Sequence, residues 1–125
     1  MENKKAVLII CHGSRSKDAV AEFDQVVELV RNSAEFPVVK GAHMEISDPD
    51  IPTALKEIVD AGASEILVVP YFLFMGNHTK NDIPEILNGL KPLYPGISIK
   101  FGKPVGIEPL MAEILIKRAK EADAR

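Results

Sequence analysis

The chain has 125 residues, of which 46% are hydrophobic, and its formal net charge is -3. This size favours a single domain over residues 1–125, and the absence of a basic excess excludes the charge pattern of a nucleic-acid-binding protein. No apolar run approaches the roughly 20 residues of a membrane span, and the six apolar residues from Ala6 to Cys11 are too few for a signal peptide, so we expect no membrane partner.

Strand and helix patterns alternate four times along the chain. In chain order, the apolar spacing predicts a strand over 5–11, a helix over 16–32, a strand over 37–46, a helix over 50–61, a strand over 65–71, a helix over 82–91, a strand over 97–101 and a helix over 108–122. Gly62 suits the end of the second helix, and Asp82 suits the N-cap of the third, with Pro84 in its first turn. In the fourth helix, the residues expected to face the core are Leu110, Met111, Ile114 and Leu115.

This alternation predicts an α/β fold of the flavodoxin-like kind, with a four-stranded parallel sheet and helices on both faces. The first and third strands are continuously apolar, as central strands are. The second strand carries polar residues and the fourth alternates, so both are expected at the edges. The predicted strand order is therefore 2-1-3-4. Ligands of such sheets bind beyond the carboxyl ends of the strands, where the first and third strands lie side by side.

Three side chains are expected to meet at that edge. His12 follows the first strand, His78 follows the apolar run that ends at Phe74, and Glu45 ends the second strand. Imidazole and carboxylate groups can bind a divalent metal or accept protons. The plain alternatives are a structural histidine in a turn and a solvated loop histidine. His43 is expected to share one strand face with Glu45, either as a site residue or as an ordinary edge-strand residue.

The residues around the histidines suit an anionic ligand. Gly13 permits close approach, and the amides of Gly13 and Ser14 lie just before a helix start, which favours anions. Arg15 and Lys80, with Lys17, either contact carboxylates or phosphates or serve only solubility. The apolar run Tyr71, Phe72, Leu73, Phe74 and Met75 is predicted to form either an apolar wall for a flat ligand or a core and dimer contact.

Cys11 is the only cysteine of the sequence, so no internal disulfide can form and a cytoplasmic location is expected. Because neighbouring strand residues face opposite sides, Cys11 is expected to point away from His12. We interpret it as a small buried apolar residue.

These motifs resemble the CbiX/SirB family of sirohydrochlorin chelatases over essentially the whole chain. The resemblance is carried by His12-Gly-Ser-Arg15, by Glu45, by Pro70-Tyr-Phe-Leu-Phe-Met-Gly-Asn-His78, by Asn81-Asp-Ile-Pro84 and by Lys103-Pro-Val-Gly-Ile-Glu-Pro-Leu110. Longer members fuse two such domains. The resemblance therefore implies a short form that works as a homodimer.

The family inserts a divalent metal ion into sirohydrochlorin, a tetrapyrrole rich in carboxylates. The resemblance implies a lyase in which His12 and His78 bind the metal or accept protons, assisted by Glu45. It implies a substrate site that comprises Gly13, Ser14, Arg15, Phe72, Leu73, Phe74, Met75, Gly76, Asn77 and Lys80. The metal would be a substrate, with no tightly bound cofactor. Cobalt, for cobalamin synthesis, is favoured by the short form; nickel for F430 and iron for siroheme are the alternatives.

Two other enzyme functions require residues that this sequence does not have. A histidine phosphatase needs an arginine directly before the histidine, where this chain has Cys11. A serine hydrolase needs a G-x-S-x-G elbow, which the sequence lacks. A non-catalytic metal or tetrapyrrole carrier would use the same histidines and stays open, because fold alone does not exclude it.

Overall fold

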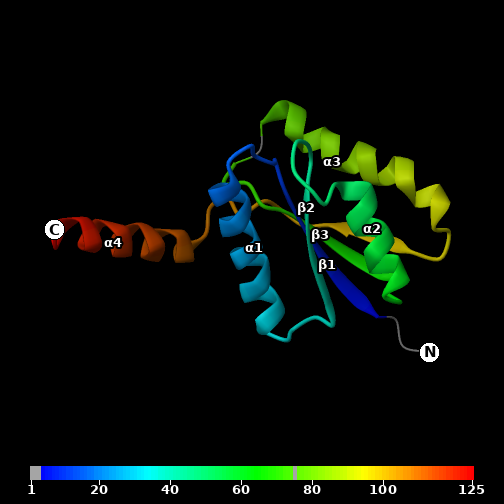
Figure 1. Cartoon of the computed structure of the whole chain (residues 1–125), viewed down its shortest axis with the longest axis horizontal. Helices are drawn as coiled ribbons and strands as arrows, with labels where there is room; N and C mark the ends of the chain where they lie inside the picture. The colour runs from blue at the N-terminus through cyan, green and yellow to red at the C-terminus, as the bar shows by residue number, and fades with distance from the viewer. Residues whose placement is uncertain (1–3, 75) are drawn as a thin grey trace.

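A four-stranded parallel sheet forms the centre of the molecule (Figure 1). The computed structural model describes residues 4–74 and 76–125, apart from the side chains of residues 77–79. The strands are β1 (Lys5–Cys11), β2 (Val38–His43), β3 (Glu65–Pro70) and β4 (Ser98–Phe101). They pair in the order β2-β1-β3-β4, and every pair is parallel. The predicted α/β fold and strand order are confirmed.

Helices follow each strand, as the alternation predicts. They are α1 (Lys17–Asn32), α2 (Ile51–Asp60), α3 (Asn77–Leu90) and α4 (Pro109–Asp123), and a short 3-10 helix, η1 (Lys91–Leu93), follows α3. Helices α2 and α3 pack on one face of the sheet, and α1 packs on the other. Within the described part of the chain, no helix is long and apolar enough to cross a bilayer.

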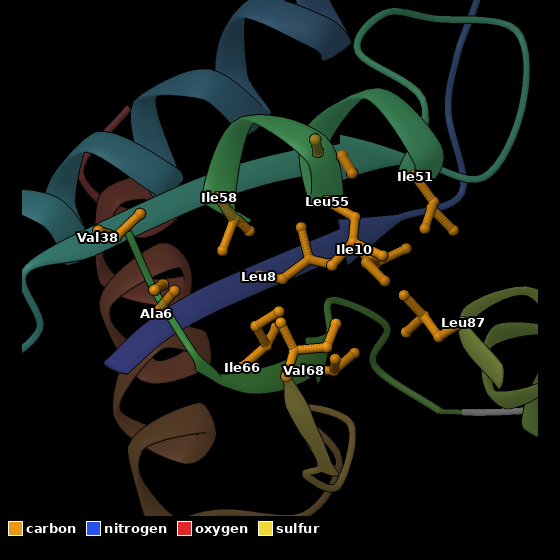
Figure 2. Packing of buried hydrophobic residues seen from close by; sticks show 14 of the residues in the cluster. Ala6, Leu8, Ile10, Val38, Ile51, Leu55, Ile58, Ile66, Val68 and Leu87 are labelled. Atoms are coloured by element: carbon orange, nitrogen blue, oxygen red, sulfur yellow. The ribbon is translucent and has the colours of Figure 1, made fainter. Parts of the chain in front are cut away.

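The core lies on both faces of β1, which explains why that strand is continuously apolar. Leu8 and Ile10 point toward Leu55 and Ile58 of α2 (Figure 2). The intervening residues of β1 point to the opposite face and pack against α1. Truncating a side chain as deeply buried as Leu8 to alanine typically costs about 2–5 kcal/mol of stability.

Close packing of α1 on β2 depends on Gly41. A Cβ atom at Gly41 would lie 2.8 Å from the Val27 side chain and 2.9 Å from the Phe23 ring. The missing side chain therefore lets Phe23 and Val27 sit directly over the strand. This contact sets the position of α1, which forms one wall of the cleft described below.

Two element boundaries differ from the sequence prediction. Helix α3 begins at Asn77, with Gly76 as its N-cap, so Asp82 is not the cap and Pro84 lies inside the helix. The polar residues before Asp82 looked like a loop, but their backbone continues the helix. Strand β2 ends at His43, where the His43 amide donates to the Pro49 carbonyl at 2.9 Å, so that the following loop returns to lie beside the end of the strand.

Helix α4 does not pack on the sheet, contrary to expectation. Leu110, Ile114 and Leu115 are exposed and Met111 is partly exposed, although all four were predicted to face the core. Figure 1 shows α4 extending from one side of the molecule, away from the sheet. Apolar spacing identified the helix and its amphipathic character, but it contains no information about which surface the helix covers.

Candidate functional site

The ends of β1 and β2 bring two sequence-predicted site residues together. Beyond the last paired strand residues, the Met44 amide donates to the Cys11 carbonyl at 2.9 Å. The Glu45 amide then donates to the His12 carbonyl at 3.2 Å. The backbone pairing of the two strands therefore continues past the sheet, and it places His12 beside Glu45.

The side chains of these residues are in hydrogen-bond contact. His12 Nε2 lies 3.0 Å from Glu45 Oε1, and the two side chains are 60% and 59% exposed. An ionised carboxylate only accepts hydrogen bonds, so the proton must sit on Nε2 when this contact forms. In the neutral ring, the lone pair is then on Nδ1. A carboxylate held against a histidine in this way orients the ring.

Gly13 allows the two loops to approach so closely. Its φ of 105° lies in the left-handed region, and a Cβ atom there would be 1.9 Å from the Glu45 carbonyl oxygen. Ser47 fastens the same loops, because its hydroxyl donates to the Ser14 carbonyl at 2.5 Å and accepts from the Ser14 amide at 3.3 Å. The Ser14 amide, which the sequence analysis assigned to ligand carboxylates, is thus engaged by Ser47.

The loop that carries Glu45 has a strained backbone, and it ends at the capped start of α2. Ile46 has a φ of 73°, which is unfavourable for a β-branched residue. At the base, Asp50 caps α2 by accepting from the Thr53 amide at 2.9 Å. Hydrogen bonds from Thr53 lower the pKa of the Asp50 carboxyl group. A closed loop of this kind holds Glu45 in place without a long side-chain network.

His43 lies inside the protein, not on the face that Glu45 occupies. Its side chain is 1% exposed, and its Nδ1 is 3.1 Å from Cys11 Sγ. The ring packs edge-to-face on Phe23, with centroids 5.2 Å apart. The expectation that His43 and Glu45 share a face is wrong, because β2 ends between them. Cys11 is half-buried and contacts His43, so it is more than an apolar filler.

A cleft of about 350 Å³ opens beside His12. It lies between α1 and the carboxyl ends of the central strands, at the place expected for a ligand of this sheet. Both polar and aromatic side chains line it: Cys11, His12, Ser14, Glu22, Phe23, His43 and Tyr71. Burial raises the pKa of the Cys11 thiol, so the cleft contains a neutral thiol at physiological pH.

The loop after β3 also reaches the site. The Tyr71 amide donates to the Ile10 carbonyl at 2.6 Å, and the Phe72 ring lies edge-on to His12 with centroids 6.5 Å apart. Leu73 and Phe74 are exposed. Of the expected apolar wall, Phe72 therefore contacts the site, whereas Met75 lies outside the described residues.

The other predicted site residues are only partly placed. The backbone of Asn77 and His78 begins α3, but their side chains lie outside the described part, so the meeting of His78 with His12 stays a prediction. Arg15, Lys17 and Lys80 are exposed, as is Gly76, the N-cap of α3. Among the described side chains, no group of three potential metal ligands occurs.

Two residues at the site were not anticipated in these positions. Ser47 was not singled out, because its partner Ser14 is distant in sequence and only the polar turn Ser47-Asp-Pro-Asp50 marked the region. Phe23 lies on the apolar stripe of α1 that packs on the sheet, yet it also lines the cleft and lies 5.8 Å from Tyr71 between ring centroids. An amphipathic pattern cannot distinguish a core aromatic residue from one that also borders a cleft.

Comparison with known sequences finds one family model, CbiX, over residues 6–122. A sirohydrochlorin ferrochelatase of Priestia megaterium is 30% identical over 118 residues, covering 94% of this chain and 44% of the relative. A sirohydrochlorin cobaltochelatase of Methanopyrus kandleri is 33% identical over 138 residues, covering 94% of this chain and 96% of the relative. This chain thus spans about half the length of the ferrochelatases that it matches.

Comparison with solved structures gives the same result. The sirohydrochlorin chelatase SirB of Bacillus subtilis subspecies spizizenii, in complex with cobalt, aligns with a TM-score of 0.89 and 36% identity, over 94% of this chain and 50% of that one. A putative cobalamin biosynthesis CbiX protein from Marinobacter aquaeolei VT8 aligns with a TM-score of 0.85 and 25% identity, over 98% of both chains.

Proposed function

Because this chain belongs to the CbiX family, we propose that it is a sirohydrochlorin chelatase, which inserts a divalent metal ion into the tetrapyrrole and releases two protons. The observation that supports this most directly is the His12–Glu45 pair, with 3.0 Å between Nε2 and Oε1 at the carboxyl edge of the sheet. The pair combines a metal-binding group with a proton acceptor at the mouth of a cleft.

The spacing of the pair suits a metal ion in transit. Two ligand atoms about 2.1 Å from one metal, at right angles, lie about 3 Å apart. His12 Nε2 and Glu45 Oε1 can therefore hold a divalent ion in place of the proton that they share. Two protein ligands leave the remaining positions to water and to the ring nitrogens, whereas closed four-ligand sites retain their metal. Nitrogen and oxygen donors together suit cobalt, nickel or iron(II).

The same residues supply proton transfer. Ring nitrogens must lose two protons as the metal enters, and an imidazole accepts protons near neutral pH. Since His12 and Glu45 are both well exposed, protons can pass from the pair to bulk water. His78 is the proposed second ligand or proton acceptor, supplied from the start of α3. The contacts of Tyr71 with β1 and of Phe72 with His12 support this role, because they hold the preceding loop at the site.

The substrate is proposed to lie in the cleft and against Phe72, Leu73 and Phe74. Its carboxylates would be bound by Arg15 and Lys80, with Gly13 and Ser14 near the ring edge and Met75, Gly76 and Asn77 completing the loop. Because the chain is acidic overall, with 15 cationic and 18 anionic side chains, these local cations must compensate.

Cobalt is the proposed metal, for cobalamin synthesis. Relatives whose length this chain covers are cobaltochelatases, from Methanopyrus kandleri at 96% and Methanothermobacter thermautotrophicus at 93% coverage. The ferrochelatases are about twice as long. Nickel and iron insertion stay the alternatives, since the ligand atoms accept all three metals.

We further propose that residues 1–125 act as one chelatase domain in a cytoplasmic homodimer. The relatives of double length support this arrangement, because each half of such a chain can correspond to one copy of this one. The single cysteine favours a reducing compartment.

Mixing the protein with sirohydrochlorin and Co²⁺, and following the absorbance of the ring, tests the function. A chelatase gives many turnovers above the spontaneous rate, and His12→Ala removes them. Stoichiometric binding without turnover would establish the carrier instead. Repeating the assay with Ni²⁺ and Fe²⁺ ranks the metals by kcat/KM.

A further inference from the structure

The contact between His12 and Glu45 is too exposed to hold itself in place. The two side chains are 60% and 59% exposed, and even a charged contact of this kind contributes little, because water screens it and two flexible side chains must be ordered. The backbone bond from the Glu45 amide to the His12 carbonyl is long, at 3.2 Å. Further contacts of the two loops must therefore keep Nε2 and Oε1 3.0 Å apart.

Directly after Glu45, the chain makes a γ-turn. The Ser47 amide donates to the Glu45 carbonyl at 2.8 Å, and Ile46, which lies between them, has a φ of 73°. This form of the γ-turn is rare and strained, and a β-branched residue makes it less favourable still. The Ile46 side chain is 59% exposed, so its burial does not compensate. Such a turn persists only where the surrounding structure holds it.

The hydroxyl group of Ser47 holds this turn in place. It donates to the Ser14 carbonyl at 2.5 Å and accepts from the Ser14 amide at 3.3 Å, so that one hydroxyl binds both backbone groups of the same residue. Ser14 lies two residues after His12, and Ser47 lies two residues after Glu45. We name this pair of hydrogen bonds between Ser14 and Ser47 the serine clamp. The clamp joins the two loops close to the side chains that meet.

The serine clamp is connected to the start of α1. The Ser14 hydroxyl accepts from the Ser16 amide at 3.0 Å, and Ser16 is the N-cap of α1, where its own hydroxyl accepts from the Ala19 amide at 3.3 Å. Helix α1 packs on the sheet. A continuous series of hydrogen bonds therefore runs from a packed helix, through the clamp, to the loop that carries Glu45.

We propose that Ser47 is a positioning residue for metal binding, whose hydroxyl fixes the turn after Glu45 and thereby the separation of the ligand atoms on His12 and Glu45. This inference rests on the proposed function, in which these two atoms bind the metal ion. Ligands that are held in place before binding lose less conformational freedom when the ion arrives. Without the Ser47 hydroxyl the turn relaxes, and Glu45 is then seldom placed to bind the ion together with His12.

The role of Ser47 concerns the metal ion and not the tetrapyrrole. Among the described residues that line the cleft, Ser14 is present and Ser47 is absent. Removing the Ser47 hydroxyl frees the Ser14 amide and takes away no group from the cleft. We therefore expect the loss of the clamp to weaken the binding of the metal ion while the KM for sirohydrochlorin does not rise.

Calorimetric titration of the full chain with Co²⁺ alone measures this effect directly. Ser47→Ala is expected to raise the dissociation constant for Co²⁺ about tenfold or more, whereas Ser47→Thr keeps the hydroxyl and restores the affinity. Ser33→Ala is the matched control, because the exposed Ser33 also donates to a backbone carbonyl, that of Val30 at 2.6 Å, at the other end of α1. An unchanged Co²⁺ affinity in Ser47→Ala, or an equal loss in Ser33→Ala, would overturn the proposal.

A double-mutant cycle distinguishes positioning from a general loss of structure. In the Glu45→Ala background the carboxylate is absent, so Ser47→Ala is expected to change the Co²⁺ affinity less than about twofold. A role of Ser47 in folding alone would give the same loss with and without Glu45. The same tenfold loss in both backgrounds would therefore refute the positioning role.

Steady-state rates of cobalt insertion separate this inference from the chelatase function. In Ser47→Ala, the KM for Co²⁺ is expected to rise and the KM for sirohydrochlorin to stay at the wild-type value. If the wild type turns over but Ser47→Ala leaves the KM for Co²⁺ unchanged, the role of Ser47 fails and the chelatase function stands. If the wild type does not turn over and yet the cycle with Glu45→Ala gives the expected result, the chelatase function fails and the role of Ser47 in metal binding stands.

Discussion

Glu45 Oε1 lies 3.0 Å from Nε2 of His12, although the two residues follow different strands of the sheet. Their contact is produced by the backbone, since the Glu45 amide donates to the His12 carbonyl. Both side chains are exposed, and His12 lines the cleft. In our proposal the pair binds the metal and accepts a proton from the substrate. The contributions of His12 and Glu45 can be tested by separate substitutions.

Replacing either member of the pair is expected to reduce turnover without unfolding the protein. His12→Ala removes the metal ligand and proton acceptor, and should lower kcat by about 10²–10⁴-fold. Glu45→Gln keeps the shape but removes the charge, and should cost about 10–100-fold. Glu35→Gln, an exposed carboxylate in the loop before β2, is the control. Initial rates of cobalt insertion and circular dichroism measure both effects. Wild-type rates in His12→Ala and Glu45→Gln would refute the site.

Substitution of Gly13 is expected to damage the site through the backbone. Gly13→Ala would place a Cβ atom 1.9 Å from the Glu45 carbonyl oxygen, so the two loops must separate. We expect reduced kcat together with a loss of stability of about 1–3 kcal/mol. The matched control is Gly89→Ala in α3, where no atom lies within 4 Å of the added methyl group and helix propensity should raise stability by about 0.5–1 kcal/mol. Urea denaturation measures both, and equal behaviour of the two variants would contradict the prediction.

The Cys11 thiol is expected to resist alkylation. Its pKa is raised above the usual value of a cysteine thiol, chiefly because burial disfavours the thiolate. The rate of reaction with iodoacetamide should therefore reach half its maximum at a higher pH in the native protein than in urea. The Cys11 thiol has a higher pKa in the folded protein than in the unfolded chain. The contribution of the buried thiol to stability is therefore fully present below the unfolded pKa, and it is lost as the pH rises through the folded pKa. A native thiol that titrates at or below the unfolded one would show that this description is wrong.

The Asp50 cap of α2 is expected to make the stability of the protein depend on pH in the acidic range. Asp50→Ala removes the bond to the Thr53 amide and should cost about 1 kcal/mol at pH 7. Since hydrogen bonds from Thr53 lower the pKa of Asp50 in the folded protein, this contribution is fully present above the pKa of the unfolded chain and is lost as the pH falls through the folded pKa. Asp82→Ala is the control, because Asp82 lies within α3 and not at its cap. Midpoints of urea denaturation at neutral and acidic pH measure the stability of both variants. If Asp82→Ala lost as much stability as Asp50→Ala, the assignment of Asp50 as the N-cap of α2 would be contradicted.

Some of the fold and site could be inferred from residues near one another in the chain. The continuously apolar β1 and β3 predicted their central position, because a strand covered on both faces must be apolar on both. Once these strands were central, the order 2-1-3-4 and a site at the carboxyl edge followed. His12 and Glu45 were identified because strand ends in parallel sheets converge, and their contact agrees with that expectation.

The start of α3 and the end of β2 were misplaced for a common reason. Both depend on hydrogen bonds that local spacing does not show. The polar residues before Asp82 form helix without a side-chain cap, and the His43 amide bonds to Pro49 of the loop that follows β2. The second of these errors placed His43 beside Glu45, when in fact it lies inside against Cys11 and Phe23.

The sequence by itself determined the periodicity, and with it the strands, the helices and the residues available at the sheet edge. The tertiary structure alone decided which atoms meet: Glu45 with His12, Ser47 with Ser14, and His43 with Cys11. It also decided that α4 lies away from its own sheet. The physical reason is that burial and helical propensity act along a short stretch of chain, whereas hydrogen-bond partners and covered faces depend on segments that meet only after folding.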